Sequence, residues 1–74
     1  MVEIGQLRMW RRRDDGGQFY NISEGLLCLV IQRFDNGMDE RGRQRPSTFT
    51  VLMDGESSWF FDHELEEHTV VVNG

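Results

Sequence analysis

The sequence has little of what usually stabilises a very small protein. Of its 74 residues, one is cysteine and one is proline. A single cysteine excludes a disulfide within the chain. Cys28 stands inside the apolar run LLCLVI, so we expect a buried core thiol and not a reactive one. No pattern in the chain predicts a cofactor.

Lysine is absent, and the two signs of charge are unevenly distributed. All eight arginines lie in residues 1–45 together with seven acids, whereas residues 46–74 hold six acids and no arginine. The net charge is −5. An acidic total argues against strong nonspecific binding to nucleic acid. Guanidinium groups, however, suit bidentate contacts with carboxylate or phosphate.

Long hydrophobic runs are also missing. The longest, Leu26 to Ile31, is far too short to span a bilayer. The opening MVEIGQLRMW lacks the apolar centre of a signal peptide. We therefore expect an intracellular or particle-associated protein that has no membrane partner.

The length allows one domain, which we place over residues 1–74. A domain of this size buries only about 60% of the surface that its unfolded chain exposes. Small scaffolds usually need a disulfide, a metal or a partner subunit for stability. With the disulfide excluded, self-association as a homo-oligomer is the expected source.

Periodicity favours strands through most of the chain. In QLRMW, Leu7 and Met9 alternate with polar neighbours and are expected on the buried face. Leu26 to Phe34 reads as a central strand because it is almost continuously apolar. TFTVLM alternates too, and places Phe49 and Val51 on one face. DDGGQ at 14–18, between the first two predicted strands, predicts a turn. Residues 35–47, between the second and the third, predict a long mobile loop.

The stretch from Phe49 to His68 is the most organised part of the sequence. Asp54-Gly55 predicts a β-hairpin, because glycine tolerates a positive φ. DHELEE fits a single 3-10 or α turn, with Asp62 as N-cap and Leu65 in the core. TVVV then supplies a last strand. The fold class expected is all-β: a small closed barrel of about five strands with a helical turn before the last one.

The segments IGQLRMW, GLLCLVIQRF and FTVLMDGESSWFFDHEL together resemble the small SH3-like barrels of tailed bacteriophages. The matching positions are Ile4-Gly5, Gly25, Val30, Val51, Asp54-Gly55, Trp59 and Leu65. The resemblance covers most of the chain, and it implies a phage-encoded accessory or structural protein in the host cytoplasm or on the virion. It implies no activity. The same ending also resembles Tudor-type barrels, which bind methylated side chains in an aromatic cage.

Catalytic and metal-binding patterns are weak. His63 and His68 lie among acids, but their spacing does not place both on one helical face, so no metal site is predicted. No serine has a nucleophile elbow around it. Plasmid-type (type II) dihydrofolate reductases are tetramers of similarly small barrels with a V-Q-I-Y segment in the pore. The comparable place here, Ser58 to Phe61, lacks the Gln and the Tyr. A non-enzyme is therefore expected, and folate reduction is the last alternative.

Two arginine groups and two aromatic residues are the candidate binding residues. Arg41, Arg43 and Arg45 alternate, so an extended loop would put all three on one side. Trp59 and Phe61 share one face of their strand, so Phe60 points the other way, onto what we expect to be the outer face of the barrel. The complete set is Arg11, Arg12, Arg13, Arg41, Arg43, Arg45, Trp59 and Phe60.

These observations favour a non-catalytic protein-interaction module. The arginine loop of one copy is expected to dock on the acidic segment 54–67 of the next. Two alternatives stay open. In the first, the arginines bind nucleic-acid phosphates while Trp10 or Tyr20 stacks on bases. In the second, Trp10, Tyr20 and Trp59 form a Tudor-like cage around a cation.

Overall fold

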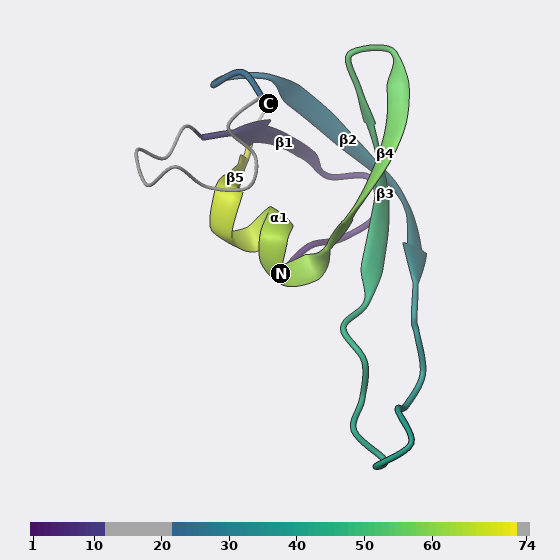
Figure 1. The fold of residues 1–74 in the computed structure, drawn as a ribbon. Helices are drawn as coiled ribbons and strands as arrows, with labels where there is room; N and C mark the ends of the chain where they lie inside the picture. Colours follow the sequence, from purple (N-terminus) through teal and green to yellow (C-terminus); the bar gives the residue numbers. More distant parts are fainter. Residues whose placement is uncertain (12–21, 73–74) are drawn as a thin grey trace.

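Five antiparallel strands and one short helix make up the fold, seen in a computed structural model that describes residues 1–11 and 22–72 (Figure 1). The DDGGQ turn expected at 14–18 lies outside the described residues. The elements in chain order are β1 Leu7–Trp10, β2 Leu27–Phe34, β3 Thr48–Met53, β4 Glu56–Phe61, α1 Asp62–His68 and β5 Thr69–Val71.

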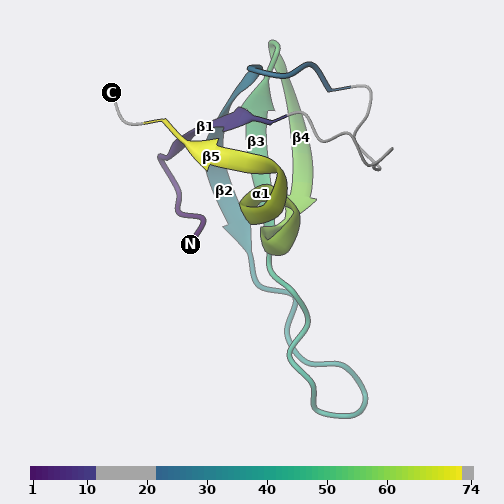
Figure 2. The ribbon, with the colours of Figure 1, turned by 90° about the vertical axis from the view of Figure 1, so that its left-hand side faces the viewer.

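The strands form one sheet in the order β4-β3-β2-β1-β5. The expected five strands and the helix before the last strand are therefore confirmed, and β2 is central as predicted. The expected closed cylinder is not formed: within residues 1–11 and 22–72, no backbone pairing joins β4 to β5. Instead α1 connects these two strands and lies in front of β3 when the sheet is viewed from its inner side (Figure 2).

The core lies between the sheet and α1. Val30 on β2, Val51 on β3 and Phe60 on β4 are buried and face inward, and Leu65 of α1 is fully buried against them, as expected. Trp10 packs edge-to-face on Phe60, with ring centroids 5.0 Å apart. Buried aromatic pairs of this kind contribute about 0.5–1.5 kcal/mol beyond the area they bury.

The face of strand β1 that points into the core is the opposite of the one predicted from the sequence. Leu7 is exposed and Met9 half-buried, whereas Arg8 and Trp10 point into the core. The alternation was predicted correctly and the face was wrong. The reason lies partly in Trp10, whose large side chain fills the core, so that Arg8, two residues earlier on the same strand, must face inward with it.

Arg8 is only 4% exposed, which is unusual for a charged side chain. Its Nε donates to Thr69 Oγ1 at 2.7 Å and its Nη1 donates to Gln6 Oε1 at 2.9 Å. The Thr69 hydroxyl in turn donates to the carbonyl oxygen of Leu65, in the last turn of α1. The guanidinium thus lies at the C-terminal end of the helix, where carbonyl dipoles favour a cation.

The β3–β4 hairpin forms as the sequence predicts. Met53 pairs with Glu56, and the two residues between them have positive φ, 53° at Asp54 and 78° at Gly55. That conformation is a type I′ turn, whose twist matches the flanking strands. The helix that follows β4 is longer than the single turn expected and has its N-cap at Phe61, one residue before Asp62. Glu64 Oε1 accepts the Phe61 backbone N–H at 2.9 Å.

Candidate functional site

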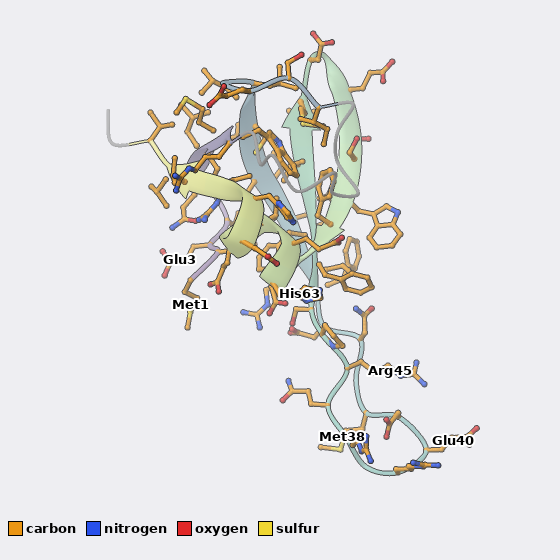
Figure 3. All side chains as sticks on the ribbon, turned by 60° about the vertical axis from the view of Figure 1, so that its left-hand side comes forward. Met1, Glu3, Met38, Glu40, Arg45 and His63 are labelled. Carbon is orange, nitrogen blue, oxygen red and sulfur yellow. The ribbon has the colours of Figure 1, made fainter. Side chains whose placement is uncertain are left out.

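The connection between β2 and β3, residues 35–47, is an arm that projects away from the body. Both ribbon views show it extending beyond the sheet as a narrow two-stranded ribbon (Figures 1 and 2). Met38, Glu40 and Arg45 stand out from it, clear of the remaining side chains (Figure 3). The expected long loop is present, but it has a defined hairpin structure of its own.

Backbone hydrogen bonds within the arm hold its two halves together. Arg45 N donates to Gly37 O and Asp39 N donates to Arg43 O, both at 2.8 Å, on either side of the Met38–Gln44 bridge. At the tip, Asp39 Oδ1 accepts the N–H groups of Arg41 and Arg43 at 2.9 Å each. A carboxylate that accepts nearby backbone N–H groups orders a turn. The arm is therefore shaped without burying an apolar side chain of its own.

The three arm arginines are exposed, and within the described residues none of their guanidinium groups has a hydrogen-bond or ion-pair partner. Arg43 and Arg45 lie on one side of the ribbon, because they are two residues apart on an extended strand. Arg41 stands in the tip turn, so the expectation of all three on one side holds for two of them. Arg33, at the base of the arm, is instead paired with Asp35 at 3.0 Å.

The acidic segment 54–67 is divided between the two ends of β4. Asp54 and Glu56 belong to the β3–β4 hairpin, which lies at the end of β3 opposite the arm (Figure 1). Across the described part of the chain, neither of these two side chains forms an ion pair or hydrogen bond. The other acids are on α1, where Glu64 caps the helix and Glu66 lies 3.2 Å from the amino nitrogen of Met1. Within the described residues, the unpaired Asp54 and Glu56 thus lie at the end opposite the arm, whose three unpaired arginines stand beside one unpaired acid of the arm, Glu40.

The face of the sheet that points away from the core, here called the outer face, carries no charged side chain at any paired position. Strand register brings Leu7, Leu29 and Leu52 side by side across β1, β2 and β3. Residues directly opposite in antiparallel strands share a face. Followed through the sheet, the register assigns these residues to the outer face: Leu7, Met9, Leu27, Leu29, Gln32, Phe34, Thr48, Thr50, Leu52, Ser57, Trp59, Phe61 and Val70.

The predicted orientations of Trp59 and Phe60 are corrected by the register. Phe60 pairs with the buried Phe49 and is itself 8% exposed, so it belongs to the core and not to an outer contact surface. Trp59 is 62% exposed and lies on the outer face, where it packs edge-to-face on Phe61 at 5.5 Å. The alternation along β4 was predicted correctly, but the inward side was assigned to the wrong residues.

Of the remaining arginine and aromatic candidates, those within the described residues do not gather into one site. Arg11 is exposed at the end of β1, while Arg12, Arg13 and Tyr20 lie outside the described residues. Trp10 is 2% exposed, which leaves no ring face for stacking on a base. Trp10 and Trp59 lie on opposite faces of the sheet, so they cannot line a common cage.

Chemically reactive groups are few in the described ranges 1–11 and 22–72, where no cluster of His, Cys, Asp and Glu could hold a metal ion. Burial raises the pKa of the Cys28 thiol, and the nearby Arg8 charge opposes this only in part. The neutral thiol is a poor nucleophile. Among the same residues, no helix has both the length and the apolar character needed to cross a membrane.

Comparison of the chain with known proteins finds no matching family model, no matching curated protein and no matching solved structure.

Proposed function

We propose that this chain is a non-catalytic protein-interaction module that assembles head to tail with copies of itself. In this assembly, the arm of one copy docks on the β3–β4 hairpin of the next. The single observation that carries the proposal is the separation of unpaired charge: three arginines against one acid, Glu40, on the arm at one end, and Asp54 and Glu56 at the other. Arginine and carboxylate form strong, often bidentate hydrogen bonds when they meet.

The shape of the arm supports the same function. An exposed hairpin that buries no apolar side chain of its own contributes little to the stability of the body. Its ordered structure therefore indicates a role in binding. Met38, 70% exposed near the tip, adds an adaptable apolar group on the side of the arm opposite Arg43 and Arg45. A head-to-tail contact is heterologous, so it repeats until the rotation between copies closes a ring or extends a filament.

The finer fold assignment, an SH3-like architecture, is part of the proposal. Two features support it: the strand order, in which the last strand lies beside the first, and the helix immediately before that strand. The sequence resemblance to small phage barrels supports a phage-encoded accessory or structural protein, in the host cytoplasm or on the virion. Mass spectrometry of purified particles would detect the chain if it belongs to the virion.

The test of head-to-tail docking is the molar mass in solution as a function of salt. We expect the assembly to shrink as sodium chloride rises from about 50 mM to 500 mM, because exposed ion pairs are screened. Neutralising the arm with Arg41→Gln, Arg43→Gln and Arg45→Gln, or the hairpin with Asp54→Asn and Glu56→Gln, should have the same effect at low salt.

The matched control is Arg11→Gln, which removes an exposed arginine that lies off the arm. It should leave the low-salt mass unchanged. The proposal is wrong if the triple arm variant and the hairpin variant both keep the wild-type mass at 50 mM salt. It is also wrong if the Arg11 control reduces the mass as much as the arm variant does.

A further inference from the structure

The outer face of the sheet is a second candidate binding surface, because its paired positions carry apolar, exposed side chains and no charged ones. The chain as a whole is 28% charged. Yet all thirteen outer positions given by the strand register are apolar or neutral polar. Depletion of charge is what distinguishes the centre of a protein interface from ordinary surface.

The size of this face also approaches that of an interface. Six large side chains on it are between 37% and 62% exposed: Leu7, Leu27, Leu29, Phe34, Leu52 and Trp59. Taken together they present on the order of 500 Å² of apolar surface, which is at the upper end for the largest patch on a monomer, about 300–600 Å². Neutral neighbours such as Thr50 enlarge the face toward the roughly 800 Å² that each partner buries in a standard interface.

Strand β2 gives independent support from the sequence. A strand that is almost continuously apolar is normally covered on both faces, as in sheets with a layer on each side. Here Cys28 and Val30 are covered by the core, whereas Leu27 and Leu29 on the other face are exposed. The apolar pattern of β2 therefore indicates a second layer, which residues 1–11 and 22–72 of one copy do not supply.

We propose that the second layer is the outer face of another copy, so that two sheets pack face to face about a two-fold axis. Two copies that each carry a net charge of −5 repel one another. Contact between their outer faces brings no charged side chain of one copy against a charged side chain of the other. The acids of α1 lie on the opposite side of the sheet. A strongly acidic or basic partner would find no complementary group on this face. Packed sheets of this kind stand about 10 Å apart.

This dimer is independent of head-to-tail docking, and salt distinguishes the two. Burial of apolar surface is not weakened by added salt, whereas the arm contact is. In 500 mM sodium chloride we expect a dimer, including in a variant whose residues 36–46 are replaced by a two-residue Asn-Gly turn, which keeps the β2–β3 register. Leu29→Lys should weaken that dimer at least 100-fold in sedimentation equilibrium, because each interface then buries two unpaired ammonium groups.

Ser23→Lys is the matched control, since it adds the same charge at an exposed position before β2 and off the outer face. It should leave the dimer intact. Leu29→Ala should give a smaller loss than Leu29→Lys. If Leu29→Lys keeps the dimer, or if the arm-shortened variant is monomeric at about 0.5 mM in high salt, face-to-face pairing is wrong. Head-to-tail docking is judged separately, by the low-salt mass of the arm and hairpin variants.

Trp59 provides a second measurement that does not depend on a substitution. In the arm-shortened variant, acrylamide quenching of tryptophan fluorescence should fall, and emission should shift to the blue, as concentration rises through the dimerisation range. Trp10 is already buried and contributes a constant signal. Quenching that stays the same from about 1 μM to 0.5 mM would overturn the inference.

Discussion

The two faces of one sheet differ in what covers them and not in how apolar they are. The inner face carries Val30, Val51 and Phe60, all buried, together with two arginines, Arg8 and Arg33. The outer face carries a row of three leucines and no charge at all. By hydrophobicity alone the outer face would be taken for the core. What makes the inner face the core is α1, which crosses from β4 to β5 and closes that side.

The largest expected difference between the faces is at two neighbouring residues of β4. Phe60→Ala should lower the free energy of unfolding by about 3–5 kcal/mol, because it leaves a cavity beside Trp10. Trp59→Ala should cost about 1 kcal/mol or less in dilute, monomeric protein, since its ring is mostly in water. Urea titrations of both variants measure this. Equal costs would mean that the two faces are equally covered in the monomer.

The next effect concerns the buried arginine. Arg8→Ala should cost about 2–3 kcal/mol, because it removes the hydrogen bonds to Thr69 and Gln6 and leaves a cavity beside the buried Thr69 hydroxyl. Arg8→Met should cost less than Arg8→Ala, because a flexible apolar chain refills the volume and carries no charge to bury. Thermal and urea unfolding of the two variants compare them. A larger loss for Met than for Ala would contradict the refilling of the Arg8 volume by an apolar side chain.

A smaller effect is expected at the β3–β4 hairpin, which joins the two faces at one end. Gly55→Ala should cost about 1 kcal/mol, because its φ of 78° is strained for any residue with a Cβ. Asp54→Asn is the control, since asparagine accepts a positive φ well and should change stability by no more than about 0.5 kcal/mol. Chemical unfolding at high salt keeps head-to-tail assembly out of the comparison. If Asp54→Asn lowers the free energy of unfolding as much as Gly55→Ala does, the turn assignment is wrong.

The smallest expected effect is a pH dependence from the inner face. Burial raises the pKa of the Cys28 thiol in the folded state. Folding therefore stabilises the protonated thiol. That contribution is complete below the pKa of an unfolded thiol and is lost as pH rises through the raised pKa.

Stability should then decline above about pH 8.5, the usual thiol value, and the decline should be weaker in Cys28→Ala. Unfolding free energies between pH 7 and 10 measure it. Labelling by a thiol reagent at neutral pH should be slow until the protein is unfolded. Fast labelling of the native protein would contradict a buried, protonated thiol.

Sequence periodicity predicted which residues alternate, but not which side of each strand faces inward. For TFTVLM the choice was simple, because Thr48 and Thr50 are more polar than Phe49 and Val51. In QLRMW the rule that apolar residues go inside favoured Leu7 and Met9, yet Trp10 brings Arg8 inward with it. In WFF all the residues are aromatic, so only the pairing of Phe60 with Phe49 decides.

The candidate site was predictable in composition and not in geometry. Arg41, Arg43 and Arg45 could be identified as a cationic group, and Asp54-Gly55 as a turn. Their placement at opposite ends of the molecule depends on the hairpin pairing of β3 with β4, which a charge count does not contain. The charge-free outer face was missed for the same reason. Its members are scattered over five segments and become neighbours only through the strand register.

The ribbon character of the arm restricts how its length can change. Side chains on its two strands alternate between sides, with Met38 and Gln44 on one and Arg43 and Arg45 on the other. Adding one residue to each strand would turn the tip over and exchange these sides, whereas adding two would restore them. The reach of this protein can therefore grow or shrink only in steps of two residue pairs, roughly 7 Å each, if the tip is to meet its target with the same side.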